Sequence, residues 1–287
     1  TGIMTIYIFF ADFLSVCFII YLLSIIVWKK KIYWLLLGIS SIFYIERIII
    51  HGKRTILFEL LFSVGVILIL GAKKHFNLVY FVIGGLLVLM LATSVKEYRT
   101  ITKQQDRDWS SVAQIDWGKN IYNNIFSEKP ELINAIYVIA AFSKKNRHLE
   151  YFSPYWNELI NRYIPGQLIG KDVKVSLSVD IGDPLWEEFQ YTPGTGTSTV
   201  GAGEVFRMFG WFGFFVFLFY GYLMRYFYNR ANQGSFSYLI IYAKFGAMIP
   251  IIVIFGTSFL FVDLILWFFL IKLMDKICLS KINRNYR

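Results

Sequence analysis

The sequence predicts an all-α integral membrane protein with about seven transmembrane helices and one large external loop domain between the fourth and fifth helices. Composition supports this fold, because 56% of the 287 residues are hydrophobic and only 17% are charged, against roughly 25% in soluble domains. The mean hydropathy of +0.53 comes from long apolar blocks without amphipathic spacing. Together these observations exclude the soluble enzyme classes.

The expected membrane helices follow from the lengths of the apolar blocks. A helix needs about 20 apolar residues to cross the roughly 30 Å of hydrocarbon in a bilayer. Seven blocks approach this length, at residues 3–28, 32–50, 55–72, 76–95, 208–228, 236–256 and 258–274.

Basic residues in the short connections set the expected orientation, because Lys and Arg are retained on the cytoplasmic side during insertion. If the seven spans alternate, one face receives Lys29, Lys30, Lys31, Lys73, Lys74, Arg225, Arg230, Lys272, Lys276, Lys281, Arg284 and Arg287. That face is then cytoplasmic, with the start of the chain outside. The net charge of +10 therefore reflects topology and does not indicate a nucleic-acid partner.

The chain divides into transmembrane helices at 1–95, an external loop domain at 96–207, and transmembrane helices with a basic cytoplasmic tail at 208–287. Two helices are expected in the external domain, from Ser127 to Phe142 and from Ser153 to Ile164, each with serine as a candidate N-cap. We expect both to lie flat at the membrane interface. A small-residue loop at 192–203 leads into the fifth span.

The start of the chain shows no basic leader, so we expect no cleavable signal peptide and an N-terminal part of a longer protein before it. The two cysteines, Cys17 in an apolar block and Cys278 in the basic tail, predict no disulfide. His, Cys, Asp and Glu show no metal-ligand spacing. The sequence therefore predicts neither a metal site nor a cofactor.

The first candidate site is the segment from His51 to Thr55, at the external mouth between the second and third spans. Lys53 and Arg54 stand there against the positive-inside trend. A guanidinium offers several donors that fit phosphate oxygens, so these residues are candidates for binding a diphosphate. The alternative is that both side chains only reach lipid headgroups. His51 beside them is a candidate base.

The second candidate site is the loop at 192–203 with Glu204 and Arg207 after it. Glycine and threonine let a ligand approach the backbone closely, and the start of the fifth helix presents unpaired amides to an anion. Glu204 suits a proton acceptor and equally suits plain helix capping.

The third candidate site runs from Arg162 to Lys174. Arg162 and Lys171 follow the interfacial helix, where Pro165 turns the chain, and together with Lys174 they can face a lipid diphosphate. The alternative is a solvated basic edge.

Four ionisable residues lie within the expected spans, where charge is costly and normally faces the bundle interior or a wet cavity. They are Asp12, Glu59, Lys244 and Asp263. The alternatives are a buried structural pair of Asp12 with Lys244 and a transport path.

Taken in order, these features resemble the C-terminal part of the bacterial O-antigen and capsule polysaccharide polymerase family, the Wzy-type oligosaccharide repeat unit polymerases. The resemblance rests on Gly52-Lys53-Arg54-Thr55, on Tyr163-Ile164-Pro165 followed by Lys171, and on Thr197-Ser198 through Glu204 to Phe209-Gly210-Trp211-Phe212-Gly213. One departure is Gly166, where relatives often carry arginine after the proline.

The resemblance implies a metal-independent glycosyltransferase of the bacterial inner membrane whose active site faces the exterior. Such an enzyme transfers the growing glycan from undecaprenyl diphosphate to an undecaprenyl-diphosphate-linked repeat unit, with a chain-length regulator as a further partner. Glu204 is then the expected catalytic base, with His51 second. The expected diphosphate-binding residues are Arg54, Lys53, Arg162, Lys171 and Arg207.

Two other functions stay open. An O-antigen ligase would hand finished polymer to another lipid by related chemistry. A non-enzymatic transporter of lipid-linked oligosaccharides would place its ionisable groups along a path at mid-membrane depth, whereas the basic and glycine-rich features here gather outside.

The polymerase interpretation predicts that Arg54→Ala abolishes surface polymer and leaves the protein level unchanged, because a leaving diphosphate loses its cation. Gel analysis of surface polysaccharide measures the polymer and immunoblotting measures the protein. Polymer of normal length from this variant would remove Arg54 from the site.

Overall fold

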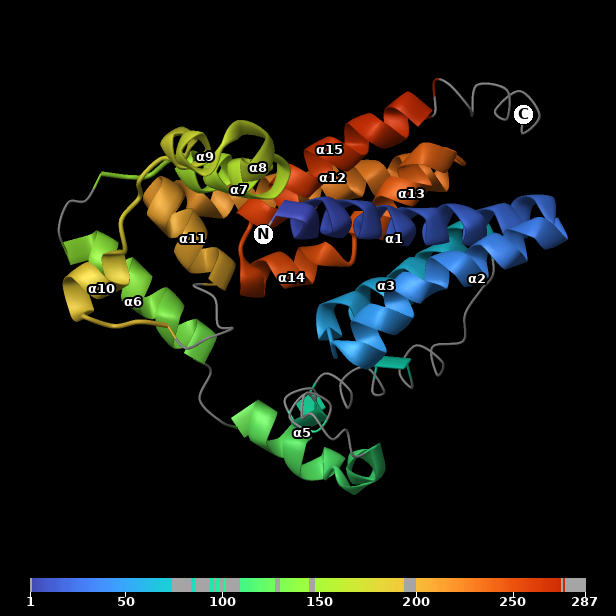
Figure 1. Cartoon of the computed structure of the whole chain (residues 1–287), viewed down its shortest axis with the longest axis horizontal. Coiled ribbons are helices and arrows are strands. Elements are labelled where there is room, and N and C mark those ends of the chain that lie inside the picture. The colour runs from blue at the N-terminus through green and yellow to red at the C-terminus, as the bar shows by residue number, and fades with distance from the viewer. Residues whose placement is uncertain are drawn as a thin grey trace. The chain divides into compact units, whose positions relative to one another are not determined.

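The computed structural model describes residues 2–73, 84–85, 93–94, 97–98, 101, 109–126, 130–144, 148–193, 200–274 and 276. These residues fall into two compact units, one of residues 11–128 and one of residues 1–10 with 129–287. Regular structure in the described residues is helical and includes no strand. The all-α prediction is therefore confirmed for the part of the chain that is described, and Figure 1 shows its helices.

The unit of residues 11–128 holds the helices expected first. They are α1 (Gly2–Trp28, of which residues 11–28 belong here), α2 (Lys31–Ile45) with a π-helical turn at Glu46–Ile50, α3 (Arg54–Val66) with a π-helical turn at Ile67–Gly71, a 3₁₀ turn at Trp109–Gln114, and α5 (Trp117–Phe126). Their bounds match the first three predicted blocks within a few residues. The fourth block, 76–95, lies outside the described residues except for 84–85 and 93–94.

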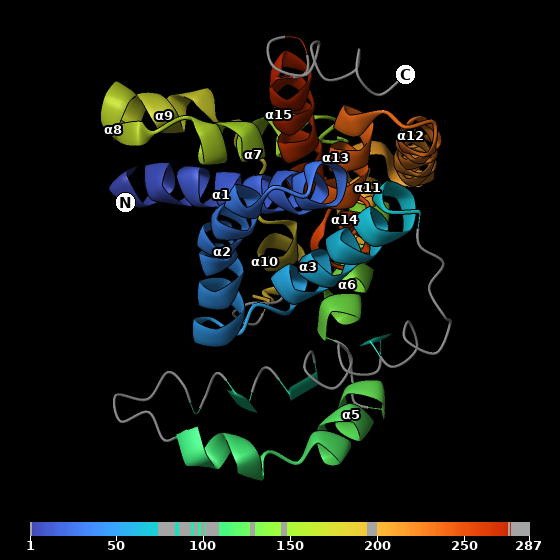
Figure 2. The same cartoon turned by 90° about the vertical axis from the view of Figure 1, so that its right-hand side faces the viewer.

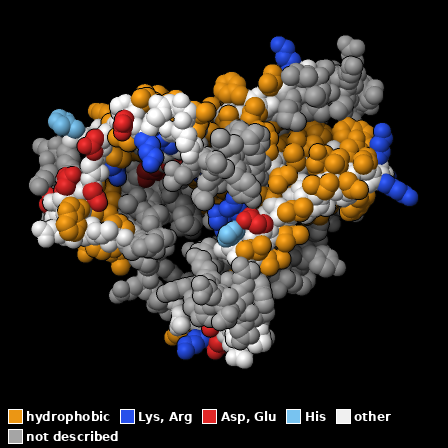
Figure 3. All heavy atoms as spheres, in the orientation of Figure 1, with side chains coloured by type: hydrophobic (Ala, Val, Ile, Leu, Met, Phe, Trp, Pro, Cys, Tyr) orange, Lys and Arg blue, Asp and Glu red, His pale blue; other side chains and the backbone are white. Residues whose placement is uncertain are grey.

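Two helical stretches among the described residues are both long and apolar enough to cross a bilayer, Lys31–Ile50 and Val200–Asn232. Figure 3 shows hydrophobic side chains covering the visible face of α2. Trp34, Leu35 and Ile42 on this helix are each more than half exposed. The shorter apolar helices do not meet the length criterion, so seven spans stay a prediction.

The second unit contains α6 (Pro130–Lys144), α7 (Ser153–Tyr163), α8 (Gly166–Ile169), α9 (Lys171–Leu177), α10 (Pro184–Phe189), α11 (Val200–Phe209), α12 (Phe214–Asn232), α13 (Phe236–Phe245), α14 (Met248–Phe255) and α15 (Ser258–Met274). Figure 2 shows α12, α13 and α15 side by side, and α13 contacts both of the others. The helix α7 matches the predicted interfacial helix, with Pro154 in its first turn. The expected serine cap is absent there, because Phe152 is the N-cap residue.

The fifth expected span, 208–228, differs from the structure. Helix α11 already begins at Val200, and a 3₁₀ turn at Gly210–Gly213 separates it from α12. Glycine explains the close packing of α11, since a Cβ on Gly201 would overlap the carbonyl oxygen of Ile252 in α14. A Cβ on Gly213 would lie 2.6 Å from the carbonyl oxygen of Val205. Residues 200–203 of the expected small-residue loop are therefore helical, and Gly201 lets α11 pack closely; residues 194–199 lie outside the described part of the chain.

The sixth expected span, 236–256, consists of two helices, α13 and α14, with a turn at Gly246–Ala247. Pro250 gives the physical reason, because proline inside a helix lacks an amide donor and its ring clashes with the carbonyl four residues earlier. That carbonyl belongs to Gly246, where α13 has ended. The seventh span, by contrast, coincides with α15.

The Gly201 contact predicts that Gly201→Ala lowers the midpoint of thermal unfolding of the purified protein in detergent. The added methyl group must push α11 away from α14, and overpacking of this kind costs about 1–3 kcal/mol. Gly221→Ala in α12 is the matched control, because nothing lies within 4 Å of its Cβ position. Equal midpoints for the two variants would contradict this account of the α11–α14 contact.

Candidate functional site

The carboxylate of Glu204 lies at the N-terminus of α15. Its Oε2 accepts hydrogen bonds from the amide and the hydroxyl of Thr257, the latter at 2.9 Å, and the amide of Ser258 donates at 3.3 Å. The first amides of a helix lack partners within it, and the helix dipole favours negative charge there. Glu204 therefore stabilises the start of α15, although it belongs to the middle of α11.

Gly256 makes this contact possible. Its φ of +110° is unfavourable for any residue with a side chain, and a Cβ there would lie 2.8 Å from Oε2 of Glu204. The chain thus turns from α14 into α15 directly beside the carboxylate.

Two buried tyrosines extend this polar cluster through Thr257. The hydroxyl of Tyr155 lies 2.8 Å from Oγ1 of Thr257, and the hydroxyl of Tyr220 donates to the Thr257 carbonyl at 3.1 Å. Burial raises the pKa of Tyr155 to about 12, so this hydroxyl stays protonated at neutral pH. The result is a connected chain from Tyr155 through Thr257 to the carboxylate of Glu204.

An open groove of about 430 Å³ runs beside this cluster. Aromatic and aliphatic side chains from α7 and the residue before it, from α11, from the 3₁₀ turn at Gly210–Gly213, and from α12 and α15 form its walls. They are Phe152, Tyr155, Phe209, Phe212, Phe215, Val216, Phe219, Tyr220 and Phe261. Tyr155 stacks on Phe261 with ring centroids 4.8 Å apart. Because Tyr155 and Tyr220 line the groove and also contact Thr257, one wall of the groove adjoins the Glu204 cluster.

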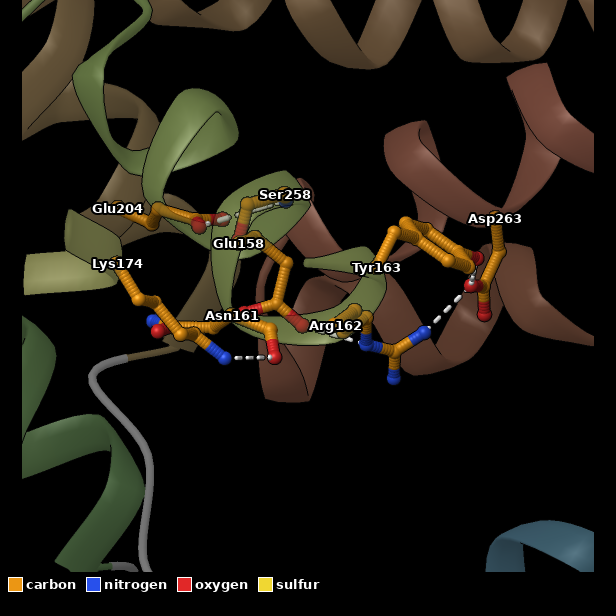
Figure 4. A network of polar contacts seen from close by, with 8 residues as sticks. All are labelled: Glu158, Asn161, Arg162, Tyr163, Lys174, Glu204, Ser258 and Asp263. Carbon is orange, nitrogen blue, oxygen red and sulfur yellow. Dashed lines mark hydrogen bonds and ion pairs between the residues drawn. The ribbon is translucent and has the colours of Figure 1, made fainter. Parts of the chain in front are cut away.

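Arg162 lies at the end of α7 between two carboxylates (Figure 4). Its Nε is 2.6 Å from Glu158, one Nη is 2.5 Å from Asp263 in α15, and its guanidinium stacks over Phe259 at 4.7 Å. Tyr163 donates to the same Asp263 oxygen at 2.7 Å. Figure 4 shows the other terminal nitrogen of Arg162 pointing away from both carboxylates, so one edge of the guanidinium faces neither of them.

The two lysines that follow differ in their contacts. Lys171 begins α9 and is exposed, whereas Lys174 donates to the carbonyl of Asn161 at 3.0 Å. Both side chains thus belong to the segment directly after α7, as the sequence predicts.

Arg207 forms an ion pair with Glu150. The pair is largely buried, with 15% of the Arg207 side chain and 10% of the Glu150 side chain exposed. One terminal nitrogen of Arg207 is buried and has no hydrogen-bond partner among the residues that the structure describes. The backbone amide of Glu150 also donates to the Arg207 carbonyl at 3.2 Å, so Glu150 provides a hydrogen bond to a carbonyl in the last turn of α11.

The residues predicted around His51 lie in the other unit, at the connection from α2 to α3. His51 Nε2 is 2.7 Å from Glu46, and Lys53 is exposed directly before α3. Arg54 is the first residue of α3, and its side chain lies outside the described part of the structure. The structure therefore groups Glu204, Arg162, Lys171 and Arg207 in one unit and His51, Lys53 and Arg54 in the other.

Sequence reasoning noticed Asp263 as an ionisable residue in a span but not as the partner of Arg162. It missed Thr257, although Gly-Thr-Ser directly before an apolar run is typical of a helix start. Nothing in the sequence apart from their aromatic character marked Tyr155 and Tyr220 as site residues. Residues from four separate helices meet here, and sequence spacing alone does not predict such contacts.

Comparison with known proteins adds no further constraint. No family model, no curated protein and no solved structure matches this chain. Within the described residues, no group of three or more His, Cys, Asp or Glu side chains is arranged to hold a metal ion. Any function is therefore inferred from the residues and their geometry.

The contacts of Arg162 predict that Asp263→Asn lowers the free energy of unfolding by about 1–3 kcal/mol. Removing one partner of a buried pair costs about 3–5 kcal/mol, and the partial exposure of this pair reduces the effect. Glu158→Gln on the exposed side of Arg162 is the control, expected to cost about 0.5 kcal/mol or less. Thermal unfolding of both variants in detergent measures the difference, and a larger loss for Glu158→Gln would contradict the assignment.

Proposed function

We propose that this protein polymerises lipid-linked oligosaccharide repeat units in the bacterial inner membrane, with its active site facing the exterior. It transfers the growing glycan from undecaprenyl diphosphate to a sugar hydroxyl of the incoming repeat unit. The observation that carries the proposal is the apolar groove beside the Glu204 cluster. The apolar groove suits the long hydrocarbon chain of the lipid carrier. The polar cluster next to it suits the transfer of the glycan from the diphosphate at the end of that chain.

Exposed apolar helix faces support the membrane part of the proposal. On α12, Phe215, Leu218 and Tyr222 are each more than half exposed, and Phe269 on α15 is 66% exposed. Soluble proteins seldom expose contiguous apolar surface of this kind, whereas lipid tails would cover it. If the seven expected spans alternate with the basic connections in the cytoplasm, α7 and the start of α15 lie at the outer surface.

The groove supports a lipid substrate. An isoprenoid chain is apolar and methyl-branched, and aromatic walls offer it large contact areas without requiring hydrogen bonds. The same groove residues Tyr155 and Tyr220 lead to Thr257 and Glu204. A carrier lying in the groove would therefore hold its diphosphate end close to charged side chains.

The proposed reaction needs a base and a cationic site. The acceptor hydroxyl attacks the anomeric carbon of the donor glycan, the bond from that carbon to the diphosphate oxygen breaks, and the hydroxyl proton passes to the base. Glu204 is the proposed base, since its Oε1 accepts a long hydrogen bond of 3.3 Å from the Ser258 amide, and His51 is the second candidate. The glycosyl transfer written in this way requires neither an oxidant nor a metal.

Cationic side chains would stabilise the undecaprenyl diphosphate that leaves. The outward edge of Arg162 and the exposed Lys171 provide donors in one unit, and the largely buried Arg207 is the third proposed cation there. Lys53 and Arg54 belong to the other unit, and their role in binding diphosphate rests on the sequence alone. The carboxylates of Glu158 and Asp263 orient the remaining donor of Arg162, and their negative charges offset its positive charge toward a diphosphate.

The function is tested by deleting the gene in the native host and complementing the strain with the complete reading frame. Collapse of the surface polysaccharide ladder to single repeat units is the expected result. Full-length polymer retained on its lipid carrier would show a ligase instead. Repeat units trapped on the cytoplasmic side would show a transporter.

The groove predicts a specific effect of Val216→Trp in the same strain. The larger side chain fills the groove, so polymer yield should fall at least tenfold, which corresponds to about 1.4 kcal/mol of lost substrate binding. Leu218→Trp is the matched control, because Leu218 lies two residues along α12 and is 60% exposed. Unchanged polymer from Val216→Trp, at an immunoblotted protein level equal to the control, would exclude the groove from the site.

A further inference from the structure

The segment that follows α7 exposes large aliphatic side chains. Leu168 in α8 is 77% exposed and Val175 in α9 is 72% exposed, with Val173 and Val179 also about half exposed. Water is an unfavourable environment for such side chains, at roughly 25 cal/mol per Å² of apolar surface. We call residues 166–179 the α8–α9 shelf.

Hydrogen bonds hold the α8–α9 shelf in place against α7. Trp156 Nε1 donates to the Leu177 carbonyl at 2.8 Å, and the Asn157 side chain both donates to and accepts from the Val179 backbone at 2.8 Å. The Lys174 ammonium donates to the α7 carbonyl of Asn161. The shelf is thus a fixed part of this unit, and its aliphatic side chains stay exposed without collapsing onto α7.

The contacts of α7 fix the level of the shelf along α15. Tyr155 near the start of α7 contacts Thr257, just before α15, whereas Arg162 at its end contacts Asp263. Asp263 follows Ser258 by five residues, which corresponds to about 7.5 Å along a helix axis. Therefore α7 descends along α15, and α8 begins three residues after Tyr163, at the level of the second turn of α15. Helix α9 then returns along α7, because Leu177 and Val179 bond to Trp156 and Asn157, so the shelf covers the levels of the first and second turns of α15.

The position of the α8–α9 shelf along α15 indicates that lipid covers its aliphatic side chains. If α15 spans the membrane, its second turn lies near the boundary between headgroups and hydrocarbon, so a partner protein would have to enter the lipid layer to cover the shelf. Lys171 shares a helix face with Val175 four residues later, an arrangement that lets the aliphatic side chain enter lipid while the ammonium reaches phosphate. Asp172 and Ser176 lie on a different face of α9 and suit water.

We infer that the α8–α9 shelf is a lipid-binding surface, which inserts Leu168 and Val175 into the outer leaflet and brings Lys171 to anionic headgroups. The inference rests on the proposed function only in requiring that α15 spans the membrane. Figure 2 shows α8 and α9 extending from α7 to the side of α15, as an arm lying along the membrane surface would. The shelf would then hold the α7 end, and with it Arg162, at a fixed depth near the diphosphates of lipid-linked substrates.

Spin labelling tests this placement in the full chain. A label is attached to Leu168→Cys or Val175→Cys after Cys17 and Cys278 are replaced by alanine, and the protein is reconstituted in nanodiscs of phosphatidylethanolamine and phosphatidylglycerol. The measurement compares the collision rates of the label with oxygen, which concentrates in lipid, and with a water-soluble nickel chelate. Phe269→Cys on the exposed face of α15 is the lipid reference, and Ser176→Cys is the matched control within α9.

We expect the ratio of oxygen to nickel collisions at Leu168 and Val175 to exceed the ratio at Ser176 and to approach that at Phe269. A ratio at Val175 equal to that at Ser176, with Phe269 in lipid, would overturn the lipid-binding surface alone. Low collision rates with both reagents would show that protein covers the shelf and would equally overturn the inference. A water-exposed label at Phe269 would instead refute the membrane placement of α15 in the proposed function.

Discussion

The hydrogen bonds from the start of α15 to the Glu204 carboxylate fix the arrangement of the candidate site. They require Gly256 in a conformation that only glycine adopts readily, and they place Thr257 where Tyr155 and Tyr220 both reach it. Because a carboxylate compensates unpaired amides and the helix dipole together, its loss would release the end of α15. The α11, α12 and α7 helices all meet this one point.

The hydrogen bonds between Glu204 and the start of α15 connect the apolar groove with the polar cluster, and the proposed function uses both. The walls of the groove come largely from the helices that meet at Thr257 and Glu204, so the same packing forms the groove and the polar cluster. Arg162 adds a second point of attachment, one and a half turns further along α15, through Asp263. A lipid carrier and its diphosphate would thus meet a preformed surface, which limits the entropy lost on binding.

The sequence predicted the elements that depend on local pattern. The apolar blocks gave the bounds of α2, α3 and α15 closely, because hydrophobic length and proline or glycine punctuation are local signals. The early start of α11 was not predictable from its glycines, which indicate a loop by propensity and in fact allow contact with Ile252. The role of Glu204 was half predicted: capping was one alternative, but the capped helix is more than 50 residues away in the chain. Such contacts depend on tertiary packing, which a single sequence does not encode as spacing.

The most direct test of the polymerase function uses the purified protein in lipid nanodiscs with an undecaprenyl-diphosphate-linked oligosaccharide as the only substrate. We predict lipid-linked products that grow by whole repeat units, together with release of one undecaprenyl diphosphate for each bond formed. Glycan that stays at the length of a single repeat unit, with no undecaprenyl diphosphate released by folded protein, would contradict the function.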